Sequence, residues 1–77
     1  MKFNATVLNL SNDLRERVQR KTETIDDGES VAMALLWGFI CDHAECHGME
    51  PGQLLKDQVD SFVDYARVNM KVTRRAH

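Results

Sequence analysis

The segment VAMALLWGFI, residues 31–40, is the feature that most constrains how this chain folds. On a helix that advances about 100° per residue, its apolar side chains spread over about 240° of the circumference. The remaining arc holds small residues such as Ala34 and Gly38, followed by the acidic Asp42 and Glu45. A helix that is apolar on this many sides has to be covered on as many sides. We therefore expect a central helix that other elements, or a second chain, must enclose.

The apolar spacing predicts one further helix on each side of this central segment. Ser11 is a good N-cap, and Leu14 and Val18 follow it at helical spacing, which predicts a helix over residues 11–25. Pro51 fits the first turn of a helix over residues 51–72, in which apolar residues recur at helical spacing and charged residues fill the other side.

The boundaries of the central helix follow from its flanks. The stretch TIDDGES is typical of a turn, and Gly48 stands where a helix is expected to stop, which predicts a helix over residues 29–47. Residues 1–10 alternate loosely and predict a short arm or strand. Residues 73–77 form a predicted frayed tail. The expected fold is a single all-α domain of three helices with a short N-terminal arm or strand.

A chain of 77 residues has little core with which to hide the central helix. A domain of this size buries only about 60% of the surface that its unfolded chain exposes. We therefore expect the protein to be a homodimer that associates through the central helix. The residues predicted for this dimer interface or core are Ala34, Trp37, Gly38, Phe39 and Ile40.

The charges are divided along the chain. Residues 1–21 carry a net charge of +3, residues 22–66 carry −9 and residues 67–77 carry +4, which gives −2 in total. This total argues against a general binder of polyanions. Complementary charge orients protein partners more than it strengthens their binding. The predicted partner-binding residues are Arg15, Arg17, Arg20 and Lys21 in the first helix and Asp57, Asp60 and Asp64 in the third.

The segment CDHAECH, residues 41–47, places two cysteines and two histidines together. His43 and His47 have the i, i+4 spacing that can share a metal ion, with Cys46 adjacent, whereas Cys41 falls on another side of the helix. Zinc signatures combine pairs from separate elements, and no second pair is present. A thiol nucleophile would need an orienting third group, and none is apparent. We therefore predict no catalytic residue, no bound metal and no cofactor, and we keep a small metal-binding protein as an alternative.

The order arm, helix, turn, helix over about residues 3–45 resembles the order of elements in ribbon-helix-helix repressors. That resemblance implies a paired strand in the major groove of DNA, with Ala5, Val7 and Asn9 facing the bases. Base contacts favour Arg, Lys, Asn or Gln, so this strand would read sequence poorly. A DNA-binding transcriptional regulator is therefore kept as an alternative and nucleic acid is not favoured as the partner.

The function that the sequence favours is a small non-enzymatic regulator, adaptor or inhibitor that binds another protein and occludes its surface. Apolar anchors at the centre and charge at the rim are typical of such interfaces. No apolar run approaches the roughly 18 residues that cross a membrane, and the N-terminus lacks the apolar core of a secretory signal. We therefore expect a cytoplasmic protein with reduced thiols and no membrane partner.

Overall fold

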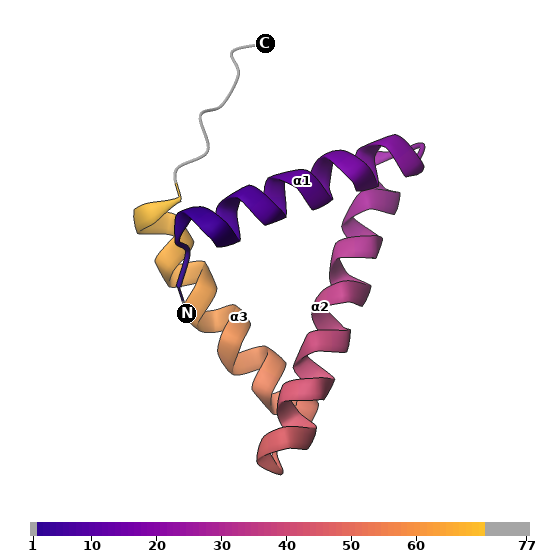
Figure 1. The fold of residues 1–77 in the computed structure, drawn as a ribbon. Helices are drawn as coiled ribbons and strands as arrows, with labels where there is room; N and C mark the ends of the chain where they lie inside the picture. Colours follow the sequence, from indigo (N-terminus) through magenta and orange to yellow (C-terminus); the bar gives the residue numbers. More distant parts are fainter. Residues whose placement is uncertain (1, 71–77) are drawn as a thin grey trace. The chain divides into compact units, whose positions relative to one another are not determined.

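The computed structural model describes residues 2–70, which form three α-helices and no strand (Figure 1). The helices are α1 (Ala5–Lys21), α2 (Ile25–His47) and α3 (Pro51–Asn69). The all-helical fold expected from the sequence is thus confirmed for this part of the chain. The predicted tail at 73–77 and the predicted end of the third helix at 71–72 lie outside the described residues.

The first helix begins earlier than the sequence predicts. Residues 5–10 are helical rather than an arm or strand, and only residues 2–4 of the described chain precede the helix. Asn4 is the N-cap, because its side chain accepts a hydrogen bond from the backbone N–H of Val7 at 2.9 Å. Ser11, the expected cap, lies inside the helix, where its hydroxyl donates to the carbonyl of Leu8 at 3.1 Å.

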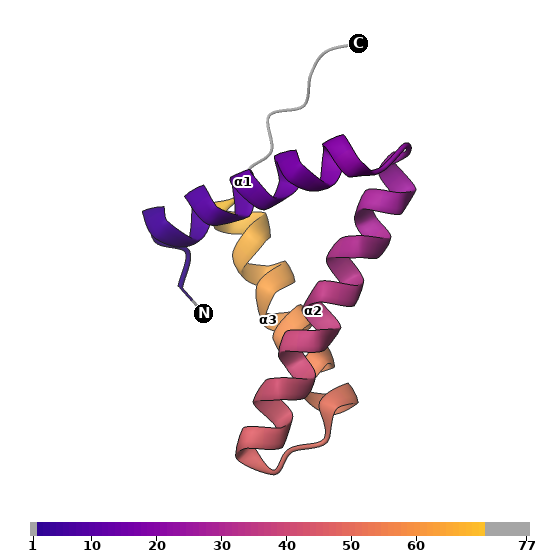
Figure 2. The same ribbon diagram turned by 45° about the vertical axis from the view of Figure 1, so that its right-hand side comes forward.

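The predicted turn TIDDGES is also shorter than expected. The first helix ends at Lys21, and Thr22 adopts an extended conformation while its backbone N–H donates to the carbonyl of Val18. The next helix already starts at Ile25, because the hydroxyl of Thr24 accepts a hydrogen bond from the backbone N–H of Asp27 at 3.1 Å. The connection between α1 and α2 is therefore only residues 22–24. Figure 2 shows it as a short loop between the two helices.

The second helix ends at His47, the residue at which the sequence places its end. Gly48 has a φ of +63°, and the backbone N–H of Met49 donates to the carbonyl of Ala44 at 2.9 Å. This combination is a Schellman cap, in which glycine adopts the left-handed conformation that other residues avoid. The third helix then starts at Pro51, with Glu50 as its N-cap.

The chain divides into two compact units, Met1–Phe39 and Ile40–His77, and the boundary falls within α2. In the second unit, Ile40 and Ala44 from α2 pack with Leu54 from α3, and Leu55 lies against this cluster. These three are the buried hydrophobic residues of the described chain. In the first unit, no described residue is buried. The small core therefore lies entirely in the second unit.

Candidate functional site

The apolar side chains of the first unit are exposed. Every residue from 29 to 39 in α2 is exposed, and Met33 and Phe39 each keep 66% of their accessible surface. The large hydrophobic residues of this unit that are exposed are Val7, Leu8, Leu10, Leu14, Ile25, Val31, Met33, Leu35, Leu36, Trp37 and Phe39. We call this set the exposed apolar surface.

The size of this surface is that of a protein interface. An aromatic side chain has roughly 150–250 Å² to bury, and with the other side chains counted at the lower end of that range, the observed fractions leave on the order of 1,000 Å² of apolar area. Single chains rarely expose contiguous apolar patches of more than about 300–600 Å². A standard interface covers about 800 Å² on each partner. The exposed apolar surface is therefore large enough for one such interface.

The predicted interface residues do not all have the same environment. Ala34, Trp37, Gly38 and Phe39 are exposed, whereas Ile40 is 6% exposed and belongs to the core of the second unit. A Cβ atom added at Gly38 would meet no atom within 4 Å. Within the described part of the first unit, Gly38 therefore has no packing role, and its side of α2 leaves room for a close approach by another helix.

Several residues of this surface were not singled out by the sequence analysis. They include Leu10 in α1 and Met33 in α2. For α1, the sequence does contain a pattern that indicates these residues. Apolar residues recur there at i, i+3 and i+4 spacing and form one stripe: Val7, Leu10, Leu14 and Val18. Assigning residues 1–10 to an arm or strand separated the first half of this stripe from the second.

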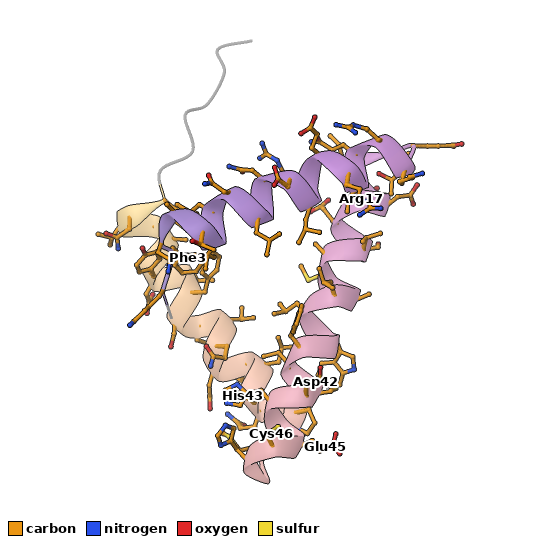
Figure 3. The ribbon with its side chains drawn as sticks, in the orientation of Figure 1. Phe3, Arg17, Asp42, His43, Glu45 and Cys46 are labelled. Carbon is orange, nitrogen blue, oxygen red and sulfur yellow. The ribbon has the colours of Figure 1, made fainter. Side chains whose placement is uncertain are left out.

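The four basic residues of α1 do not share one face. At about 100° per residue, Arg17, Arg20 and Lys21 fall within an arc of about 100°, and Arg15 falls on another side. Arg20 also forms an ion pair with Glu16 at 2.6 Å, with both side chains largely exposed. Figure 3 labels Arg17 in the C-terminal half of α1. The helix thus leaves a smaller basic face than the four residues suggest.

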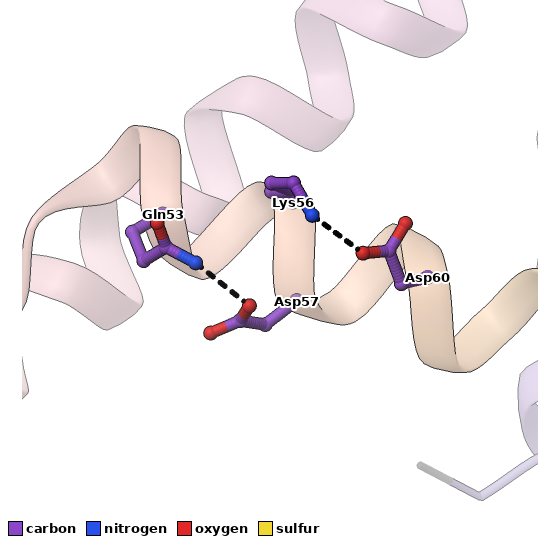
Figure 4. A network of polar contacts seen from close by, with 4 residues as sticks. All are labelled: Gln53, Lys56, Asp57 and Asp60. Carbon is purple, nitrogen blue, oxygen red and sulfur yellow. Dashed lines mark hydrogen bonds and ion pairs between the residues drawn. The ribbon is translucent and has the colours of Figure 1, made fainter.

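The three predicted acidic residues of α3 do share a face. Asp57, Asp60 and Asp64 fall within an arc of about 60°. Two of them have partners in α3 itself, as Figure 4 shows: the amide of Gln53 donates to Asp57 at 2.9 Å, and the ammonium of Lys56 donates to Asp60 at 2.9 Å. The hydrogen bond and the charge of Asp60 raise the pKa of Lys56 above its ordinary value. This face therefore presents less free negative charge than its sequence suggests.

The histidine pair at the end of α2 is brought together by the helix. The ring centroids of His43 and His47 are 4.8 Å apart, with the ring planes at 63°. Both cysteines are free thiols; Cys46 is exposed and Cys41 is partly buried. Figure 3 shows His43 and Cys46 on α2, with Asp42 and Glu45 directed away from His43. Within residues 2–70, no three or more His, Cys, Asp or Glu side chains are grouped so as to hold a metal ion.

The strand that the ribbon-helix-helix resemblance implies is not present in the described residues. Its DNA-reading element would be a strand in the first ten residues, but residues 5–10 are the first turns of α1. Ala5, Val7 and Asn9 are thus helical residues, and no strand exists in the part of the chain that is described. Residues 5–10 are helical because Asn4 caps the helix and because the apolar stripe of α1 has helical spacing rather than the alternation of a strand.

No family model, curated protein or solved structure matches this chain. None of the helices in residues 2–70 has the length and hydropathy of a membrane span. The function is therefore inferred from the residues and their geometry.

Proposed function

We propose that this protein is a small non-enzymatic regulator, adaptor or inhibitor that dimerises and binds another protein, occluding part of that partner's surface. One observation carries the proposal. The first unit holds eleven exposed large hydrophobic residues and, among its described residues, no buried one. Apolar surface of this extent is costly to leave in water, at roughly 25 cal/mol per Å².

The second copy binds along the side of α2 that carries Ala34 and Gly38, with Trp37 beside them. Small residues let two helix backbones approach closely, and the open space at Gly38 supports this contact. Trp37 is 44% exposed in the single chain and provides the large aromatic anchor that interface centres favour.

The other protein binds on the side of α2 that carries Phe39, which lies about 100° from Gly38 around the helix. Charged residues on α1, chiefly Arg17 and Lys21, form the rim of this contact. Rim charges are exposed and therefore influence the rate and specificity of association more than its affinity.

A substitution at Gly38 tests the dimer. Gly38→Arg adds a long side chain where the single chain has open space, so the helix is kept and the close approach is blocked. Light scattering over a range of concentrations is expected to show a dimer for the natural chain and a monomer for Gly38→Arg. Val68→Arg, at an exposed position in α3, is the control and is expected to remain a dimer. A natural chain that stays monomeric at high micromolar concentration would contradict this part of the proposal.

Affinity capture from the source cells, followed by reconstitution, tests the regulatory part. A protein recovered with the natural chain is purified, and its dissociation constant is measured with Phe39→Asp and with Val68→Asp. Phe39 and Val68 are comparably exposed, at 66% and 72%, but lie in different units. Loss of one interface anchor costs about 2 kcal/mol or more, so Phe39→Asp is expected to weaken binding at least about tenfold while Val68→Asp has little effect. Recovery of nothing but the chain itself would overturn the regulatory function and leave the dimer alone.

A further inference from the structure

We propose that His43 and His47 form a two-imidazole chelate for a late first-row divalent metal ion, such as Ni²⁺ or Zn²⁺, near the C-terminal end of α2. This inference is independent of the proposed protein-binding function. Imidazole nitrogen is a preferred ligand of these ions, and an i, i+4 pair places two such ligands on one side of a helix.

The separation of the two rings fits a shared ion. With metal–nitrogen bonds of about 2.0–2.1 Å, each ring centre lies about 3.2 Å from the metal. Two such rings are then about 4.5 Å apart at a right-angled N–metal–N arrangement and about 5.2 Å apart at a tetrahedral one. The observed centroid separation of 4.8 Å lies between these values. The two rings are thus already at a separation that a shared ion allows, and chelation requires side-chain rotations that turn one nitrogen of each ring toward the ion.

Both imidazoles are available to bind. His43 and His47 are exposed, and within the described residues each ring contacts the other. Metal binding therefore breaks no hydrogen bond that either ring makes within residues 2–70. The Schellman cap at Gly48 fixes the end of the helix that carries both residues. The carbonyl groups at a helix C-terminus carry partial negative charge, which favours a cation at this end.

The thiol of Cys46 is not part of this site. It projects about 60–100° away from the two histidines around α2. Since no third His, Cys, Asp or Glu joins the pair within residues 2–70, water completes the coordination. We therefore expect an affinity far below that of a four-ligand structural zinc site, with no requirement of the metal for folding.

Calorimetric titration of the untagged chain with Ni²⁺ tests the chelate. We expect one ion per chain, and no binding of Mg²⁺, which prefers oxygen ligands. Because the second imidazole binds intramolecularly once the first is engaged, losing either is expected to weaken Ni²⁺ binding by on the order of 100-fold. His43→Ala and His47→Ala are therefore expected to show equal losses. Cys46→Ser is the control and is expected to bind Ni²⁺ as the natural chain does.

Thermal unfolding, followed by circular dichroism, supplies a second readout. Alanine favours helix more than histidine does, so both histidine variants are expected to retain the helical signal. Ni²⁺ is expected to raise the melting temperature of the natural chain and of Cys46→Ser, but of neither histidine variant. The proposal is overturned if the natural chain binds no Ni²⁺, if one histidine variant keeps full affinity, or if Cys46→Ser abolishes binding.

Discussion

Glu50 shows how a single residue can make the folding of this chain sensitive to acid. Its carboxylate accepts hydrogen bonds from the backbone N–H groups of Gly52 at 2.8 Å and Gln53 at 2.6 Å. These bonds, that from Gln53 contributing most, lower the pKa of Glu50 from its ordinary value of 4.5. A carboxyl group whose pKa is lower in the folded state stabilises that state fully above its unfolded pKa. This contribution is lost as the pH falls through the folded pKa.

We therefore predict that Glu50→Ala lowers the melting temperature at neutral pH. The difference from the natural chain is expected to shrink as the pH falls below about 4.5, because the protonated carboxyl no longer caps α3 as a charge. Melting curves recorded between pH 7 and pH 3 measure this. A difference that stays constant over that range would show that the charged cap does not stabilise the folded state.

The backbone conformation at position 48 requires glycine. With φ at +63°, any residue with a Cβ atom is strained, so Gly48→Ala is expected to lower the free energy of unfolding by about 1–2 kcal/mol. Gly28 is the matched control, because it lies within α2 and an added Cβ would make an ordinary contact with Val18 at 3.7 Å. Gly28→Ala is expected to raise the free energy of unfolding by about 0.5–1 kcal/mol. Urea denaturation compares the two variants, and equal changes in their free energies of unfolding would contradict the left-handed conformation of Gly48.

At the scale of the helices, the small core of the second unit carries most of the apolar packing. Leu54 is 5% exposed and packs with Ile40 and Ala44, whereas Val68 on the same helix is 72% exposed. Truncating a buried leucine costs about 2–5 kcal/mol, so we expect Leu54→Ala to remove much of the stability of this unit. Val68→Ala is expected to change the free energy of unfolding by less than about 0.5 kcal/mol. Urea denaturation followed by circular dichroism measures both changes.

The sequence predicts the helices better than their ends. The spacing of apolar residues indicates each helix, and Gly48 and Pro51 mark a stop and a start that the structure also has. The N-termini of α1 and α2 are set by competition between nearby caps. Asn4 accepts the backbone hydrogen bond in place of Ser11, and Thr24 accepts one at the start of α2, four residues before the expected start at residue 29. Such competition depends on side-chain geometry that spacing alone does not contain.

The candidate sites also differ in how well the sequence predicts them. The i, i+4 spacing of His43 and His47 fixes their proximity once the helix forms, so that pair is predictable. Spacing likewise places the aspartates of α3 on one face, and the i, i+4 spacing of Lys56 and Asp60 also indicates the ion pair that neutralises part of that charge. That Phe39 is exposed while Ile40 is buried depends on tertiary packing, which the sequence pattern does not determine.

At the scale of the whole molecule, the two units differ in how much apolar surface they bury. All the buried hydrophobic residues described lie in the second unit, so its backbone is expected to open less often than that of the first. Hydrogen exchange measured by mass spectrometry is expected to give slower exchange in residues 40–66 than in residues 5–39 of the free chain. Association through α2 is expected to slow exchange in residues 31–39. Equal protection of both units in a monomer would contradict this prediction.

The absence of buried side chains in the described part of the first unit bears on how readily the protein is degraded in a cell. Under the proposed function, a copy that is not associated keeps the apolar residues of its first unit exposed and is open to proteases. Unassembled copies would be degraded and assembled ones spared, so the abundance of this chain would follow the abundance of what it binds rather than its own rate of synthesis.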